Sequence, residues 1–318
     1  VDVTLGDATF AYTVLANGGV MRGQPAVVPH DPGERTLDPV ILMSVRSSRG
    51  WNYDATRPQE ERVMAESVTY LVTSIISDAK NTCIVWTCGA LEVPGRPTAH
   101  KTGTSAPFEN SITAIGDTWA FGYTPDLVVG VWIGNADKRP MANIYSTTIA
   151  WPIWRDVIDD VSKQLVLAPK PFVRPSMVAE ATLCWPSGYV AGTLCPSDRR
   201  YKGLVATDSK PLQDTWWQRV AADGTLVSNV AQAAVGAEVR LVLPASEVAL
   251  RAWLSSQGSG LLFTPDVAIT SPAAQQRVSG VVTITGHASP PGAASSAVEF
   301  GVGSSPSSWT SIQTMTGP

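Results

Sequence analysis

The residue types with the clearest chemical use stand together at positions 100–105, which read His-Lys-Thr-Gly-Thr-Ser. A lysine amine can hold an anion or move a proton, and a threonine hydroxyl can donate a hydrogen bond. Gly103 has no side chain, so the backbone of a bound chain can approach it closely. By average composition, the bare tripeptide Lys-Thr-Gly should arise by chance in roughly one chain in twenty of this length. Its meaning therefore depends on the elements and motifs around it.

Apolar spacing predicts the elements that must position this run. The first predicted helix stops at Asn17-Gly18-Gly19, a C-terminal stop signal. The clearest helix has apolar residues at helical spacing from Val63 to Ile75, and two strand patterns flank Thr124-Pro125-Asp126 as in a hairpin. The predicted segments are a helix end at 9–16, a strand at 40–46, a helix at 60–76, strands at 118–123 and 127–134, and a closing helix at 149–162. These patterns indicate an α+β fold with helices packed on an antiparallel sheet.

The blocks around the run occur in a recognisable order. Ala-Asn-Gly-Gly stands upstream at residues 16–19, and Pro-Ile-Trp-Arg stands downstream at residues 152–155. Between them, residues 116–135 read Gly-Asp-Thr-Trp-Ala-Phe-Gly-Tyr-Thr-Pro-Asp-Leu-Val-Val-Gly-Val-Trp-Ile-Gly-Asn. Lys-Thr-Gly is one of three motifs of serine enzymes that act on penicillin and on D-alanyl peptides. Together, the blocks across residues 1–165 resemble the C-terminal half of the transpeptidase domain of class A (bifunctional) penicillin-binding proteins.

The resemblance implies roles for the run and a substrate. The Lys-Thr-Gly strand would form one wall of a groove in which a peptidoglycan stem peptide ending in D-Ala-D-Ala adds as an extra strand. Lys101 would be the catalytic lysine of this motif, near the terminal carboxylate, and Thr102 and Thr104 would offer hydroxyls to that carboxylate. Gly103 would admit the substrate backbone, and the N–H of Thr104 would supply half of an oxyanion hole. β-Lactams would bind the same groove, and no cofactor is implied.

The chain departs from the complete family pattern. The family's nucleophile motif, Ser-x-x-Lys, and its Ser-x-Asn motif both precede Lys-Thr-Gly, and Ser-x-Asn occurs nowhere in this sequence. Ser77-Asp78-Ala79-Lys80 matches Ser-x-x-Lys, but it stands at the end of a predicted helix rather than at its start, so we interpret Ser77 as non-catalytic. We expect the nucleophile, a glycosyltransferase domain and a membrane anchor to lie upstream of Val1, and this chain alone to be inactive.

The rest of the chain predicts two further parts. Prolines at 169, 171 and 175 indicate a stiff linker at the start of a cysteine-containing, β-rich extension over residues 166–264. Residues 265–318 are rich in Ser, Gly, Pro and Thr and alternate like short strands. They resemble an immunoglobulin-like module that some long family members carry, here truncated at Pro318.

Composition and cysteine spacing limit the function classes. With 23 basic and 27 acidic residues and a net charge of −4, a duplex-binding basic domain is disfavoured, and no nucleic-acid partner is expected. The cysteines form two local pairs, Cys83 with Cys88 and Cys184 with Cys195, whose spacing does not fit a zinc site. Two short-range disulfides would place the chain outside the cytoplasm, on the outer side of the bacterial plasma membrane; four reduced, buried thiols are the alternative.

Three functions stay open from the sequence. The first is peptidoglycan cross-linking by a serine D,D-transpeptidase that binds penicillin. The second is a non-catalytic, peptidoglycan-binding or interaction protein, which the β-rich residues 166–318 favour because they contain no chemical motif. The third is a D,D-carboxypeptidase or β-lactamase relative, against which the blocks after Lys-Thr-Gly argue.

Overall fold

The computed structural model divides the chain into two compact units. The first consists of Val1–Glu180 with Leu204–Lys210, and the second of Ala181–Gly203 with Pro211–Pro318. The described residues are 3–26, 28, 30–83, 85–105, 114–221, 226–227, 237–244, 247–256, 262–263, 267–272, 277–288, 295–302 and 308–316. The first unit contains the Lys-Thr-Gly run. The domain boundaries predicted after residues 165 and 264 stay predictions.

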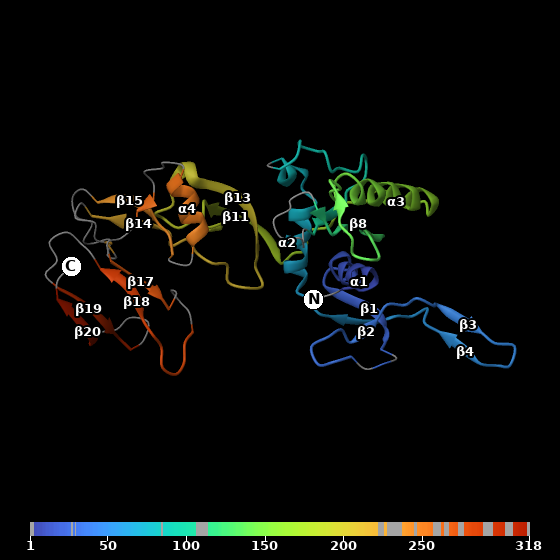
Figure 1. Ribbon diagram of the computed structural model, residues 1–318, viewed down its shortest axis with the longest axis horizontal. Helices are drawn as coiled ribbons and strands as arrows, with labels where there is room; N and C mark the ends of the chain where they lie inside the picture. The colour runs from blue at the N-terminus through green and yellow to red at the C-terminus, as the bar shows by residue number, and fades with distance from the viewer. Residues whose placement is uncertain are drawn as a thin grey trace. The chain divides into compact units, whose positions relative to one another are not determined.

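The first unit is a mixed α+β structure in which every described strand pair is antiparallel (Figure 1). Its helices are α1 (Leu5–Ala16), α2 (Glu66–Ile76) and α3 (Ala150–Gln164), with a 3-10 turn, η1 (Ala79–Thr82). Its strands are β1 (Val20–Pro25), β2 (Leu37–Asp38), β3 (Ser44–Arg46), β4 (Asn52–Asp54), β5 (Gln59–Arg62), β6 (Ala99–Thr104), β7 (Ala114–Ile115), β8 (Asp117–Tyr123), β9 (Val128–Gly134) and β10 (Met141–Ala142). This mixed architecture agrees with the predicted class.

The central sheet has the strand order β6-β8-β9 and contains the run on β6. Thr102 lies opposite Ala120, and Gly103 lies opposite Trp119. Strands β8 and β9 form the predicted hairpin, whose turn is held by Thr124: its hydroxyl accepts hydrogen bonds from the N–H groups of the two residues at 126 and 127, at 3.2 and 3.0 Å. A side chain that fixes its own turn in this way explains why the local sequence predicts the hairpin.

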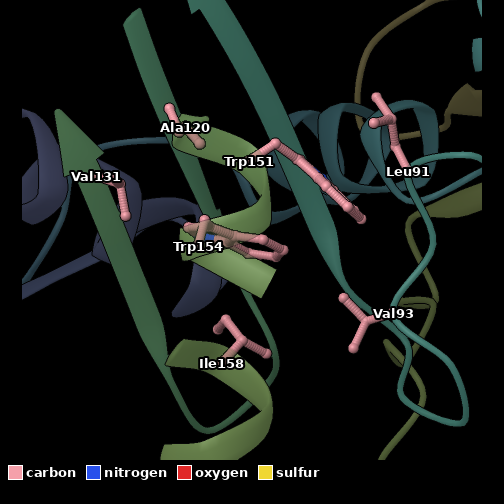
Figure 2. Close-up of a cluster of buried hydrophobic side chains, with 8 residues drawn as sticks. Leu91, Val93, Ala120, Val131, Trp151, Trp154 and Ile158 are labelled. Carbon is pink, nitrogen blue, oxygen red and sulfur yellow. The ribbon is translucent and has the colours of Figure 1, made fainter. Parts of the chain in front are cut away.

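Helices cover both faces of this sheet, because successive strand residues point to opposite sides. Ala120 faces α3 and packs in a buried cluster with Trp154 and Ile158 (Figure 2). Phe121 faces the opposite side, where Tyr12 of α1 stacks on it with ring centroids 5.0 Å apart. The sheet is therefore fixed between α1 and α3.

Helix α2 differs from its prediction in its start and in its buried face. The helix begins at Glu66, because residues 59–62 form β5 and pair with β1 instead. Its buried residues are Ser67, Thr69 and Thr73, whereas Ile75 is 59% exposed. The threonine hydroxyls donate to backbone carbonyls one turn earlier, at 2.9 Å, which satisfies them in the interior. The predicted strand at 40–46 is likewise shorter and spans only β3.

The second unit has its own core around the second cysteine pair. The buried residues of this core are Cys184, Cys195, Trp216, Trp217, Leu241, Leu243 and Leu254. Its elements are β12 (Tyr189–Val190), η2 (Ser197–Arg199), β14 (Trp217–Val220), β15 (Glu238–Val242), α4 (Val248–Ser256) and β16 (Leu262–Phe263), with residues 181–184 of β11 (Val178–Cys184) and residues 200–203 of β13 (Arg200–Ala206). Strands β15 and β16 are parallel. The indole N–H of Trp217 donates to the carbonyl of Trp185 at 2.8 Å, which ties β14 to the loop after β11.

The last described strands form two antiparallel pairs. Strand β17 (Val267–Ser271) pairs with β18 (Thr285–Ala288), and β19 (Ser295–Phe300) pairs with β20 (Thr310–Thr316). The β content agrees with the strand patterns of residues 265–318. That the module is immunoglobulin-like and truncated stays a prediction.

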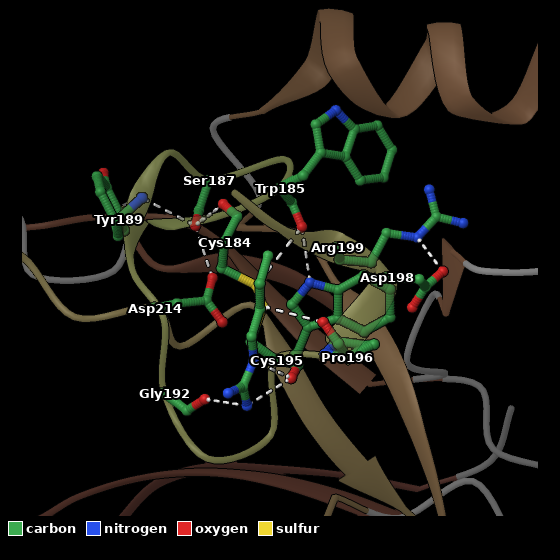
Figure 3. Close-up of a disulfide and its surroundings, with 12 residues drawn as sticks. Cys184, Trp185, Ser187, Tyr189, Gly192, Cys195, Pro196, Asp198, Arg199 and Asp214 are labelled. Atoms are coloured by element: carbon green, nitrogen blue, oxygen red, sulfur yellow. Dashed lines mark hydrogen bonds and ion pairs between the residues drawn. A yellow bond between two sulfur atoms is a disulfide. The ribbon is translucent and has the colours of Figure 1, made fainter. Parts of the chain in front are cut away.

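Both predicted cysteine pairs are joined in the structure, Cys83 to Cys88 and Cys184 to Cys195. Figure 3 shows the second of these bonds. Replacing both Cys184 and Cys195 with serine should lower the free energy of unfolding of the second unit by about 3 kcal/mol, because this bond closes a loop in the unfolded chain. Calorimetry of the full chain measures it. The matched variant Cys83→Ser/Cys88→Ser should leave the second unit's transition unchanged, and equal effects of both variants on that transition would contradict the expectation.

Candidate functional site

The Lys-Thr-Gly run lies on an edge strand. Strand β6 pairs with β8 on one side, and no described strand pairs with its other side. The alternation of the sheet puts the Lys101 side chain on the face that α1 covers and those of His100, Thr102 and Thr104 on the α3 face. The Lys101 amine reaches the edge and donates to the carbonyl of Thr102 at 2.5 Å.

The backbone direction of β6 decides which groups an incoming chain would meet. The N–H of Ser105 donates to the carbonyl of Asp117 at 3.0 Å, so Ser105 faces β8. In an antiparallel ladder, alternate residues face the partner strand. The N–H and C=O groups of Thr104 and Thr102 therefore point away from β8, to the open edge. The Thr102 carbonyl accepts from the Lys101 amine, so the N–H of Thr102 and both backbone groups of Thr104 are the groups that can pair with an extended peptide.

A cavity of about 450 Å³ opens beside this edge. Its walls come from the end of α2, from η1, from the loop up to Thr98, and from residues 100–102 of β6. Trp86, Leu91 and Val93 form apolar parts of the wall. The charged lining residues are Asp78, Glu92, Arg96 and Lys101, two of each sign. The cavity is thus an apolar hollow with a few charged groups, a composition that suits a small ligand or a peptide end.

The loop that borders the cavity is held at three points. The disulfide between Cys83 and Cys88 closes its first part. Leu91 and Val93 insert into the core cluster beneath α3 (Figure 2). The guanidinium of Arg96 donates to the carbonyl of Leu167 at 2.9 Å. The wall of the cavity is therefore fixed to the same core as the sheet.

Thr104 has a partner that the sequence did not reveal. Its hydroxyl donates to the Ser146 hydroxyl at 3.0 Å and accepts from the Ser146 N–H at 3.1 Å. Ser146 is buried, at 6% exposure, in the loop before α3. The Thr104 hydroxyl is thus already bonded, whereas its backbone N–H and C=O face the open edge. No local pattern marks Ser146, which lies 42 residues from Thr104.

Ser77 and Lys101 line the same cavity, although Ser77 belongs to another element. Ser77 directly follows α2, and its N–H donates to the carbonyl of Thr73 at 2.9 Å. A helix C-terminus carries a partial negative charge, which disfavours negative charge developing on a serine oxygen. Lys80 is exposed and does not line the cavity. The placement therefore gives Ser77 neither a favourable field nor a lysine in the cavity from its own motif.

His100 lies half-buried beneath α3, beside the cavity. Its ring lies 5.3 Å from the Trp154 ring and 6.0 Å from the Trp151 ring, and its Nδ1 is 3.5 Å from the Thr98 hydroxyl. Burial lowers the pKa of His100 to about 4, so the ring is neutral at pH 7. This packing against two tryptophan rings is typical of a structural histidine.

The stability of the first unit should therefore depend on pH through His100. Between pH 6.5 and about 4 the unfolded chain binds a proton at this ring and the folded chain does not, so stability falls as the pH falls. Relative to pH 7, the free energy of unfolding should fall by about 3 kcal/mol at pH 4 through this group. Urea unfolding of the wild type and His100→Gln at pH 7, 5.5 and 4.5 measures the difference. Identical pH dependence of the two proteins would contradict the prediction.

The structure gives two further results on binding and membranes. Among the described residues, no group of three or more His, Cys, Asp or Glu side chains is placed to hold a metal ion. Within the same residues, no helix combines the length and the apolar character that a membrane crossing requires.

The chain is similar to known proteins over part of its length, although no family model matches it. Penicillin-binding protein 1A/1B of Bacillus subtilis is 27% identical over 186 residues, which cover 55% of this chain and 20% of that protein. Penicillin-binding protein 1A of Mycolicibacterium smegmatis is 29% identical over 170 residues, or 48% of this chain and 18% of the relative. The chain thus spans about a fifth of the length of the curated relatives it matches.

Part of the chain also matches a solved structure. The penicillin-binding protein PonA1 from Mycobacterium tuberculosis matches with a TM-score of 0.42 and 25% identity, over 54% of this chain and 40% of that one. PonA1 has also been solved in complex with penicillin V. Over part of its length, the chain is homologous to the transpeptidase region of class A penicillin-binding proteins, which relates it to peptidoglycan synthesis.

Proposed function

We propose that β6 is the substrate-binding edge of a serine D,D-transpeptidase that cross-links peptidoglycan, and that residues 1–165 correspond to the C-terminal half of its transpeptidase domain. One observation supports this most: the Lys-Thr-Gly run lies on an edge strand whose open side borders a cavity. Edge strands bind extended peptides through backbone hydrogen bonds. The homology to penicillin-binding proteins supplies the class of peptide, a stem peptide ending in D-Ala-D-Ala.

The groups at this edge suit that substrate. The Lys101 amine would bind the terminal carboxylate with the hydroxyl of Thr102, and Gly103 would allow the peptide to lie close to β6. The outward N–H of Thr104 would donate to the oxyanion that forms on the attacked carbonyl. These residues supply substrate binding and electrostatic stabilisation.

The reaction requires a serine nucleophile. The serine oxygen attacks the penultimate D-Ala carbonyl, its proton passes to a base, and the terminal D-Ala leaves with a protonated amine. The acyl group then passes to the amine of a neighbouring stem. We propose that Ser77 is not this nucleophile, because it ends α2, and that the chain alone forms no acyl-enzyme. β-Lactams would be recognised at the same edge, and the protein would act outside the cytoplasm.

A fluorescent penicillin tests the covalent step. We expect no labelled band when the full chain is incubated with the probe, denatured and separated by electrophoresis. A band that Ser77→Ala abolishes would overturn the assignment and place the nucleophile at Ser77. A labelled, full-length penicillin-binding protein serves as the positive control for the probe.

Peptide binding tests the substrate-binding edge separately. A stem-type peptide ending in D-Ala-D-Ala should shift backbone N–H resonances of β6 in NMR spectra, and Lys101→Ala should weaken its binding about tenfold. Lys80→Ala is the matched control, since it removes the same charge from η1 but from outside the cavity. Equal binding of a peptide ending in L-Ala-L-Ala, or equal loss in both variants, would contradict the proposal.

A further inference from the structure

A two-stranded hairpin, formed by β3 and β4, projects from the first unit. Strands β3 and β4 pair only with each other among the described strands, and Figure 1 shows them projecting away from the helices and the central sheet of that unit. Its attachment is the hydroxyl of Tyr53, which donates to the side-chain oxygen of Gln24 on β1. An isolated two-stranded ribbon is marginally stable in water, so a partner surface would stabilise it.

One face of this hairpin is apolar. Val45 lies opposite Tyr53, and Met43 and Trp51 follow on the same face, because the carbonyl of Met43 accepts from Ala55 and the carbonyl of Trp51 accepts from Ser47. Met43 is 63% exposed and Trp51 is 61% exposed. The residues that lead into β3 are equally open, with Ile41 at 84% and Leu42 at 60%. Four large apolar side chains therefore face solvent within one hairpin.

The same segment is positively charged, in contrast to the rest of the chain. Residues 40–58 contain Arg46, Arg49 and Arg57 against the single acid Asp54, whereas the chain has a net charge of −4. In the described part of the molecule, no ion pair within 4.0 Å involves these arginines. Arg46 acts electrostatically on Asp54 of the same hairpin, so the charges of Arg49 and Arg57 are the ones available for an anionic partner.

We infer that this hairpin is a contact with the surface of an anionic lipid bilayer. Ile41, Leu42, Met43 and Trp51 would enter the interface, while the arginines bind lipid phosphates. The size of the exposed apolar surface favours a bilayer over a folded protein as the partner. Four such side chains offer on the order of 400 Å² of apolar surface, about half of what each partner buries in a standard protein interface. A tryptophan beside arginines, in contrast, suits the boundary between headgroups and acyl chains. The inference does not depend on the peptide-binding edge.

Vesicle sedimentation of the full chain tests the inference. The wild type should bind vesicles that contain phosphatidylglycerol, bind neutral phosphatidylcholine vesicles at least about tenfold more weakly, and lose affinity as salt is raised. Met43→Ser/Trp51→Ser should lower binding to anionic vesicles about tenfold or more. Arg49→Gln/Arg57→Gln should remove the preference for anionic over neutral vesicles.

A matched variant controls for the loss of apolar surface in general. Val248→Ser/Trp253→Ser removes an aliphatic residue and a tryptophan of similar exposure, 68% and 52%, from α4, and it should bind like the wild type. Circular dichroism and a thermal scan establish that each variant is folded. Absence of wild-type binding, binding unaffected by Met43→Ser/Trp51→Ser, or an equal loss in the α4 variant would overturn the inference, as would capture of the hairpin by a protein partner instead of lipid.

Discussion

Gly122→Ala should strongly destabilise the central sheet, because the added methyl group would meet backbone and ring atoms that cannot move aside. Gly122 lies on β8 directly opposite His100 and beneath α3. A Cβ there would lie 2.5 Å from the carbonyl oxygen of Ala99, 2.5 Å from the Trp154 ring and 2.6 Å from the Cβ of His100. Because β8 is held by a strand on each side, it cannot move away. We expect the free energy of unfolding of the first unit to fall by about 3 kcal/mol and its Tm to fall by about 6–12 °C. Calorimetry measures both.

Gly103→Ala is the matched control for that variant. Gly103 is on β6, and a Cβ there would make its nearest contact with the Cβ of Trp119 at 3.6 Å, an ordinary van der Waals distance. The same methyl group should therefore leave the Tm within about 2 °C. If Gly103 serves close approach of a peptide, Gly103→Ala should still weaken binding of the D-Ala-D-Ala peptide. Equal losses of stability in the two variants would show that the strands on either side of β8 do not hold it in place.

The elements that could be predicted from the sequence are those with local signals. The stop after α1 is one, because Gly18 and Gly19 adopt positive φ angles of 62° and 90°, and a side chain at Gly19 would meet the carbonyl of Met64. The hairpin of β8 and β9 is another, because Thr124 bonds its own turn. Helix α3 forms where it was predicted, with Trp154 and Ile158 fully buried, although Ile153 and Val157 of the apolar pattern are exposed.

Helix α2 shows why apolar spacing can mark the wrong face. Thr69 and Thr73 are buried because their hydroxyls bond the helix backbone and, in the case of Thr73, the hydroxyl of Tyr123 at 2.7 Å. That contact joins residues 50 positions apart, and burial raises the pKa of Tyr123 to about 12, which keeps the phenol neutral as a partner. No window of sequence contains both groups, so the pattern alone could not find the interior face.

The candidate site also contains some residues that a local sequence signal reveals and others that only tertiary packing brings together. The run at 100–105 could be found because its residues are contiguous. The cavity could not, because its wall combines the end of α2, η1 and a disulfide-closed loop, and depends on where Leu91 and Val93 are packed. Ser146 could not be found either, since it reaches Thr104 only through the packing of the loop before α3.

Trp154→Ala should cost the first unit more stability than any other replacement of a tryptophan in it. Trp154 is fully buried at the centre of the core cluster (Figure 2), and its indole N–H donates to the carbonyl of Val129 at 3.0 Å. Removing the ring leaves a cavity between α3 and the sheet, at a cost of about 3–5 kcal/mol in the free energy of unfolding. Trp154→Phe keeps most of the volume but leaves the Val129 carbonyl unpaired, so it should cost about 2 kcal/mol. Urea unfolding measures both.

The same variant should also report on the site, because Trp154 covers His100 at a ring distance of 5.3 Å. Loss of that cover hydrates the His100 ring, so its pKa should rise from about 4 towards the ordinary value in an NMR titration of Trp154→Ala. Trp51→Ala removes an equal ring that is 61% exposed and should change neither the stability nor the His100 titration. If both variants were equally stable, or if the pKa of His100 did not rise, then α3 would not be the element that holds β6 and its Lys-Thr-Gly run in place.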